Sequence, residues 1–202
     1  MKQYLDIVEN VLLNGKPKEN RTGTKCFSTF CEVFRHNMSD GFPLLTSKKM
    51  PIKTIAIELE GFIKGVTDKR WFQERGCKIW NEWANPKAVE FSHGKIGDLI
   101  QNNDILKQAQ YHEVDLGPIY GYQWRNWNKD YGDMSGHYQG IDQLSKVIDT
   151  LKNNPDDRRM VVSAWNPSQM HLMALPPCHY AFTIVHIDGV LNLCWKQRSA
   201  RS

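Results

Sequence analysis

The sequence predicts an α+β (mixed α/β) fold, because helix-like and strand-like segments alternate along one chain. Three segments have apolar residues at helical spacing: 2–14, 53–64 and 141–152. Four runs have the composition or the alternation of strands: 27–34, 160–165, 181–187 and 190–195. There is no internal repeat, low-complexity segment or linker, so residues 1–202 are expected to form a single domain with a sheet surrounded by helices.

The N-terminal helix is predicted from five residues on one stripe: Tyr4, Ile7, Val8, Val11 and Leu12. Gly15 is a typical stop for it. In the second helix, 53–64, the expected inner face carries Ile55, Leu59 and Phe62, and Glu58 lies beside that face. A partly buried carboxylate has a raised pKa, whereas a glutamate that extends into solvent does not; both outcomes are open for Glu58.

The C-terminal elements have clear boundaries. The helix over 141–152 has four apolar residues at helical spacing (Ile141, Leu144, Ile148 and Leu151) and ends before Pro155. Asp188-Gly189 predicts a hairpin between the last two strands. The polar, weakly patterned stretch 86–112 is interpreted as a surface excursion with a short helix over 105–111.

Composition restricts the function classes. The 202 residues are 41% hydrophobic and 24% charged with a net charge of +4, and no run of five or more basic residues indicates nucleic-acid binding. No long apolar stretch or signal peptide supports membrane insertion or export. The five cysteines are irregularly spaced without a C-x-x-C pair, which argues against a disulfide framework or a metal site and favours a reducing, cytoplasmic location.

The most distinctive local feature is Cys178, which follows Pro176-Pro177 and precedes His179. A cysteine near cationic groups is a typical nucleophile, and Arg158-Arg159 and Arg198 are candidates to bind a phosphate-bearing substrate. The alternatives are a packed core cysteine and a solvated arginine pair. Likewise, the tryptophans of the 79–83 segment either pack in the core or stack on a flat ring.

Eight separated motifs occur in order: Arg21-Thr22-Gly23-Thr24, Gly41-Phe42-Pro43-Leu44, Trp80-x-Glu82-Trp83, Leu116-Gly117-Pro118-Ile119-Tyr120-Gly121-x-Gln123-Trp124-Arg125, Asp157-Arg158-Arg159, Ser163-Ala164-Trp165-Asn166-Pro167, Met173-Ala174-Leu175-Pro176-Pro177-Cys178-His179 and Gln197-Arg198-Ser199. Together they closely resemble the thymidylate synthase family. The resemblance covers essentially the whole chain, and so many motifs in one order make it highly specific.

The resemblance implies conversion of dUMP to dTMP, with 5,10-methylenetetrahydrofolate as carbon donor and reductant. It implies that Cys178 adds to C6 of the pyrimidine, which makes C5 nucleophilic. Glu58 matches the family's general acid–base residue, and Tyr120 matches a tyrosine near the C5 proton. Trp80 matches an aromatic residue near the folate.

The remaining matches concern the nucleotide. Five residues match the family's phosphate cage: Arg21, Arg158, Arg159, Arg198 and Ser199. Gln197 and His179 match polar positions around the substrate. In the family the arginine pair reaches into the partner subunit, so the resemblance implies a homodimer.

The chain also departs from the family pattern. Arg201 stands where an aspartate is expected, and the family continues past this point, so a C-terminal part of the domain is expected to be missing. Internal departures are Lys25, Pro51, Glu60-Gly61 and Asn81. Two other functions remain open: a dUMP/dCMP hydroxymethylase on the same scaffold, and a non-catalytic truncated remnant.

Overall fold

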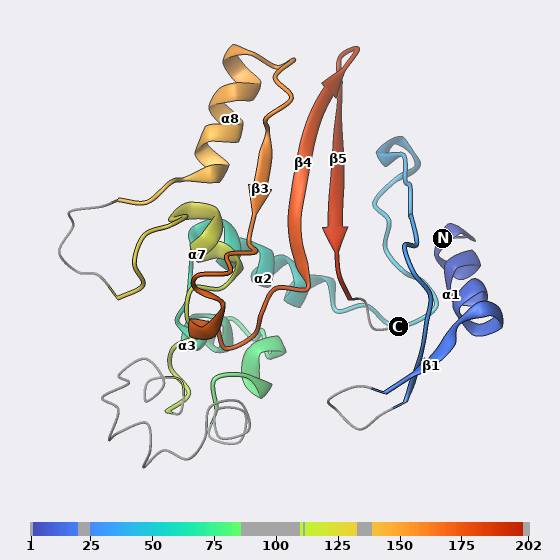
Figure 1. The fold of residues 1–202 in the computed structure, drawn as a ribbon, viewed down its shortest axis with the longest axis horizontal. Coiled ribbons are helices and arrows are strands. Elements are labelled where there is room, and N and C mark those ends of the chain that lie inside the picture. Colours follow the sequence, from blue (N-terminus) through green and yellow to red (C-terminus); the bar gives the residue numbers. More distant parts are fainter. Residues whose placement is uncertain (1, 20–24, 86–109, 111, 133–138, 200–202) are drawn as a thin grey trace. The chain divides into compact units, whose positions relative to one another are not determined.

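The computed structural model describes residues 2–19, 25–85, 110, 112–132 and 139–199. They belong to two compact units, residues 1–51 and residues 52–201. Figure 1 shows the helices and strands of both units, and the single domain expected from the sequence stays a prediction.

The first unit contains one helix and a short antiparallel pair of strands. Helix α1 (Lys2–Asn14) ends where the Gly15 N–H donates to the carbonyl of Val11. Strand β1 (Lys16–Lys18) pairs with β2 (Cys26–Ser28), and a 3₁₀ turn, η1 (Met38–Asp40), follows. The strand predicted over 27–34 is wrong beyond Ser28, because Cys31 adopts a φ of 63° that no extended strand accepts.

The second unit contains two of the predicted helices and several short ones. Helix α2 (Ile52–Lys64) and helix α8 (Gln143–Asn153) lie close to their predicted bounds, and the Asp142 carboxylate caps α8 by accepting the Ser145 N–H at 2.9 Å. The helical elements that the sequence did not predict are α3 (Lys69–Glu74), η2 (Ile79–Glu82), α7 (Tyr120–Arg125) and η3 (Met170–Leu172). Each spans less than two helical turns, which is too short for a periodic pattern to form.

Three antiparallel strands in the order β3-β4-β5 form the sheet of this unit. They are β3 (Val161–Ser163), β4 (His179–Ile187) and β5 (Val190–Gln197). The predicted hairpin is confirmed: Ile187 pairs with Val190, and Asp188 and Gly189 both have positive φ, as a tight turn of this kind requires. The sheet register places Val161 opposite Thr183.

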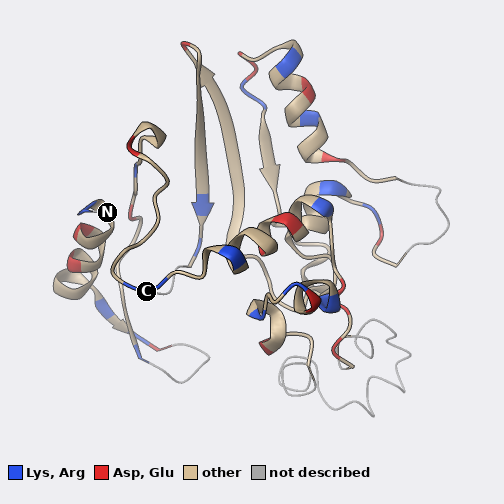
Figure 2. Ribbon diagram, turned by 180° about the vertical axis from the view of Figure 1, so that it is seen from behind, with Lys and Arg blue, Asp and Glu red and all other residues tan. Residues whose placement is uncertain are grey.

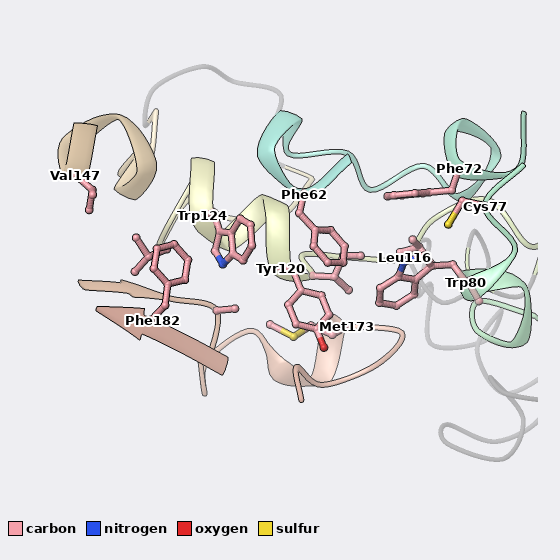
Figure 3. Packing of buried hydrophobic residues seen from close by; sticks show 14 of the residues in the cluster. Phe62, Phe72, Cys77, Trp80, Leu116, Tyr120, Trp124, Val147, Met173 and Phe182 are labelled. Atoms are coloured by element: carbon pink, nitrogen blue, oxygen red, sulfur yellow. The ribbon is translucent and has the colours of Figure 1, made fainter. Parts of the chain in front are cut away.

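The core of the second unit lies between α2, α7 and one face of the sheet (Figure 3). Phe62 of α2 packs against Tyr120 and Trp124 of α7, and Trp124 meets Phe182 of β4 edge to face. The predicted inner face of α2 needs one correction, since Leu59 is 46% exposed. In α8 the same holds for Ile148, which is 51% exposed, while Val147 is buried.

Helices α2 and α7 touch at the level of their backbones. A Cβ atom at Gly121 would lie 2.5 Å from the carbonyl oxygen and 2.7 Å from the Cα of Phe62. Arg125 of α7 adds a polar contact to this junction, since it donates to the Ile63 carbonyl at 3.0 Å, and its ion pair with Asp142 at 2.8 Å joins α7 to the start of α8. Residue 121 must therefore lack a side chain for Tyr120 to reach Phe62.

Gly121→Ala should lower the free energy of unfolding by about 2–3 kcal/mol, because the new methyl group meets backbone atoms that cannot rotate away. Urea unfolding followed by circular dichroism measures the loss. Lys53→Ala, an exposed substitution in α2, is the control and should change stability by less than about 0.5 kcal/mol. Equal stability of Gly121→Ala and wild type would show that α7 packs differently.

Candidate active site

Cys178 is half-buried and lies at the turn that leads into β4. Arg198, just after β5, holds this turn with three hydrogen bonds. Its backbone N–H donates to the Cys178 carbonyl at 2.9 Å, and its guanidinium donates to the carbonyls of Pro177 at 2.9 Å and Pro176 at 3.1 Å. The same guanidinium lies over the ring of Trp165, 5.6 Å from its centroid. A permanent positive charge therefore lies within the turn that carries the thiol.

Tyr120 connects α7 to the cysteine. Its hydroxyl oxygen accepts the backbone N–H of Cys178 at 2.8 Å. Burial raises the pKa of this phenol, and the charges of Cys178 and Glu58 act in the same direction. Because that hydroxyl proton is retained at neutral pH, the phenol can donate one hydrogen bond while it accepts another.

His179 extends the aromatic layer toward the sheet. Its ring stacks on Tyr120 with centroids 4.2 Å apart, and Tyr120 stacks on Phe62 at 4.7 Å. Trp195 of β5 lies on the other side of the imidazole at 5.2 Å. Burial among these rings lowers the pKa of His179 to about 4, so the imidazole is neutral at pH 7.

Glu58 is the acidic group of this neighbourhood. Burial raises its pKa from 4.5 to about 7, so of the two outcomes that the sequence left open the structure has the partly buried carboxyl on α2. The indole N–H of Trp80 acts weakly in the opposite direction. Trp80 is only 3% exposed, and its Nε1 has no partner at hydrogen-bond geometry in the described part of the chain. The contact with Glu58 is thus looser than a full hydrogen bond.

The structure brings six of the predicted site residues into one neighbourhood, all in the second unit: Glu58, Trp80, Tyr120, Cys178, His179 and Arg198. The ring contacts and hydrogen bonds above connect four of them directly, and Glu58 and Arg198 both act electrostatically on Tyr120. Trp80 packs edge to face against Tyr120, with centroids 6.0 Å apart. It therefore lies in the core, on the inner side of the neighbourhood.

Arg158 and Arg159 lie elsewhere, on the turn between α8 and β3 (Figure 2). Since Val161 pairs with Thr183, five residues along β4 from Cys178, strand geometry separates Arg159 and Cys178 by roughly 20 Å. The Asp157 carboxylate accepts the Arg159 N–H at 2.7 Å, but the Arg159 side chain is 90% exposed. These arginines cannot reach a substrate on Cys178 of the same chain.

The other predicted site residues have few described contacts. Gln197 and Ser199 are exposed, and the Gln197 amide donates to the Ser199 carbonyl at 2.6 Å. Arg21 and Arg201 lie outside the described residues, as does most of the 86–112 excursion with its predicted short helix. Sequence reasoning missed two residues that touch the site: Trp165, which lies under Arg198, and Trp195, which lies against His179. Trp165 belongs to the Ser163–Pro167 motif, so the motif itself was the signal.

The fold and the site together define an α+β protein whose cysteine lies among neutral, buried proton carriers and one arginine. The family model described as thymidylate synthase matches residues 2–201, and the chain therefore belongs to the thymidylate synthase family. Membership of this family makes the chain an enzyme by resemblance, with a function of the dUMP methyltransferase type. Among the described residues, no helix is long and apolar enough to cross a bilayer, and no group of three His, Cys, Asp or Glu side chains is placed to hold a metal ion.

The two shifted groups have opposite effects on stability. The pKa of Glu58 is higher in the folded chain, so its contribution is full below about pH 4.5 and is lost as the pH rises through about 7. The pKa of His179 is lower in the folded chain, so its contribution is full above about pH 6.5 and is lost as the pH falls through about 4. In the wild type the two slopes largely cancel between pH 4.5 and 6.5.

In Glu58→Gln, the pH dependence of the free energy of unfolding should therefore be that of His179 alone. The free energy of unfolding of this variant should rise between pH 4 and 6.5 by on the order of 2 kcal/mol, measured by urea unfolding at several pH values. His179→Asn is the matched variant and should show the opposite slope, a loss of stability from pH 4.5 to 7. A Glu58→Gln profile that parallels the wild type would exclude the raised pKa of Glu58.

Proposed function

We propose that this protein converts dUMP to dTMP with 5,10-methylenetetrahydrofolate as co-substrate, through a covalent bond between Cys178 and C6 of the pyrimidine. The single observation that supports this most is the contact between the Tyr120 hydroxyl and the Cys178 backbone, beside a glutamate with a pKa near neutrality. A nucleophile held by one proton carrier and accompanied by a second is the arrangement that such chemistry requires.

Cys178 is the nucleophile in this proposal. Addition of its sulfur to C6 makes C5 of the pyrimidine electron-rich, and C5 takes the one-carbon unit from the folate. The C5 proton is then lost, hydride from the folate reduces the transferred carbon to a methyl group, and the sulfur leaves C6, which frees dTMP and the thiolate. The turn is held by Arg198 from one side and Tyr120 from the other, so the backbone of Cys178 is fixed before substrate binds. Such pre-organisation reduces the entropy that is lost when reacting atoms are brought together.

Glu58 and Tyr120 move or hold protons in the proposed reaction. A carboxyl with a pKa of about 7 is present in both protonation states at neutral pH, so Glu58 can both donate and accept a proton. Tyr120 stays neutral, and its proposed role is to exchange the proton at C5. His179 is also neutral, so it serves as a polar support without adding charge.

The nucleotide phosphate needs cations, and this chain supplies one of them next to Cys178. Arg198 is that cation, and Arg21, Gln197 and Ser199 are proposed to join it. Because Arg158 and Arg159 lie at the far end of β3, we assign them to the phosphate site of a partner subunit. A homodimer in which each subunit completes the other's site accounts for their exposed position.

Trp80 is proposed to form the inner wall of the folate site. Its ring is buried against Phe62 and Tyr120, while its N–H faces Glu58. An aromatic wall can pack against the flat ring system of a folate, and a titratable carboxyl beside it can exchange hydrogen bonds with the ring nitrogens. The folate, when bound, supplies the carbon unit and the hydride.

A fluorinated dUMP together with 5,10-methylenetetrahydrofolate should form a covalent adduct on Cys178, because fluorine at C5 blocks the last proton loss. Mass spectrometry of peptides detects the adduct. Cys178→Ser should abolish it, whereas Cys194→Ser, an exposed cysteine on β5, should leave it unchanged. An adduct on Cys194, or one that survives in Cys178→Ser, would refute the assignment. With dUMP itself, a hydroxymethyl product in place of dTMP would favour the hydroxymethylase.

Arg159→Ala should weaken dUMP binding about tenfold or more and deoxyuridine binding far less, since a charge-assisted contact to phosphate contributes about 1.5–3 kcal/mol. Isothermal titration calorimetry with both ligands measures the difference. Mixing Arg159→Ala with Cys178→Ser after dissociation should restore part of the turnover, because some mixed dimers then contain one intact site. No restored turnover, or equal losses for nucleotide and nucleoside, would contradict the shared phosphate site.

A further inference from the structure

Lys69 is the most deeply buried charged residue that the structure describes, with only 1% of its surface exposed. It is the first residue of α3, and the reaction proposed above does not use it. Burial lowers the pKa of its ammonium, since removal from water disfavours the charged form. A buried lysine of this kind needs a full set of acceptors.

Three carbonyl oxygens supply those acceptors. The Lys69 ammonium donates to Trp83 at 3.1 Å and to Asn81 and Ala84 at 3.3 Å each. Asn81 belongs to the 3₁₀ turn η2, and Trp83 and Ala84 follow directly after it, so the ammonium lies at the C-terminal end of this turn. The Lys69 ammonium thus caps the C-terminal end of η2 through these three carbonyls.

A second segment meets the same residue. The Glu113 carboxylate lies 3.8 Å from the ammonium, and the Lys69 backbone N–H donates to the Val114 carbonyl at 2.9 Å. Glu113 partly restores the pKa of the lysine. Lys69 therefore joins α3, the end of η2 and the segment that leads to Tyr120.

The turn that Lys69 caps carries Trp80. The Trp80 indole packs edge to face against Phe62 at 6.1 Å and against Tyr120 at 6.0 Å, so its position depends on where η2 ends. Within the part of the chain that the structure describes, its N–H has no partner at hydrogen-bond geometry, and it acts on Glu58. The other titratable groups that act on or respond to Glu58 are Cys77, which follows α3, and Tyr120 of α7.

We propose that Lys69 is a positioning residue for the reaction: by capping η2 it fixes the Trp80 indole against Glu58 and keeps water away from that carboxyl. The effect of Lys69 on catalysis rests on the proposed function, whereas its effect on the pKa of Glu58 can be tested without it. Lys69 contacts neither Glu58 nor the cysteine turn in the described residues, and its hydrogen bonds at the end of η2 make Trp80 the route to Glu58 that the proposal tests.

The decisive experiment is a titration of Glu58 in the folded protein without ligand. Carbon-13 labelled glutamate, with the signal assigned by its loss in Glu58→Gln, reports the midpoint by NMR. The wild-type midpoint is expected near pH 7. Lys69→Met, which fills the same space without charge or donors, should lower it by about one pH unit, since a looser indole lets water solvate the carboxylate. Lys78→Met, an exposed lysine at the start of the same turn, should leave the midpoint unchanged.

A double-mutant cycle shows whether the effect passes through Trp80. In a Trp80→Phe background, Lys69→Met should shift the Glu58 midpoint by less than half of its effect in the wild-type background. Additive shifts, or an unchanged midpoint in Lys69→Met despite a lower Tm, would show that Lys69 is only structural and would overturn the proposal. If Lys69→Met does not fold, Lys69→Gln carries the same prediction, because its shorter amide has two donors for three oxygens.

Kinetics separate this inference from the proposed function. If the protein is an active synthase, the apparent pKa of kcat in Lys69→Met should move with the NMR midpoint, while KM for dUMP changes less than twofold. If the apparent pKa of kcat stays the same while the NMR midpoint of Glu58 moves, Lys69 does not act on catalysis through Glu58. Absence of turnover and of adduct in the wild type would refute the proposed function, and the NMR cycle would still decide whether Lys69 positions Trp80.

Discussion

The close approach of α2 and α7 at Gly121 is the constraint on which the candidate site depends. Only a residue without a side chain lets α7 rest on the backbone of Phe62. That contact stacks the ring of Tyr120 on Phe62 and brings its hydroxyl to the backbone of Cys178. It also places Tyr120 within electrostatic reach of Glu58, one turn before Phe62 on α2. One glycine therefore aligns two helices and the strand turn that carries the thiol.

Burial then determines the protonation states of the side chains around this junction. The pKa of Glu58 and of Tyr120 is raised, and the pKa of His179 is lowered, each mainly by desolvation. All three shifts favour the neutral form, which leaves the guanidinium of Arg198 as the permanent charge among these residues. A nearly neutral, water-poor site strengthens the electrostatic interaction with an anionic substrate, and a glutamate near neutrality can pass protons in both directions.

Helix α3 packs against α2 and so supports the helix that carries Glu58 and Phe62. Its Trp71-Phe72 pair packs over Gly61, where an added Cβ would run into the ring of Phe72. The first residue of the same helix, Lys69, caps η2 and thereby holds Trp80.

Local pattern was enough to predict the long helices, the hairpin at Asp188-Gly189 and the set of candidate residues, because periodicity, turn chemistry and motif order are written along the chain. The place of Glu58 beside an apolar stripe left its burial open, and the packing around α2 decided it. What only the tertiary structure decided is which of these residues meet. Cys178 and Tyr120 come together because elements distant in sequence pack against each other. Arg159 lies at the opposite end of the sheet from Cys178, because it precedes β3, Cys178 precedes β4, and these two strands run antiparallel. The strand predicted beyond Ser28 failed for a related reason: its composition suits a strand, but a strand also needs a partner, and the backbone turns away at Cys31.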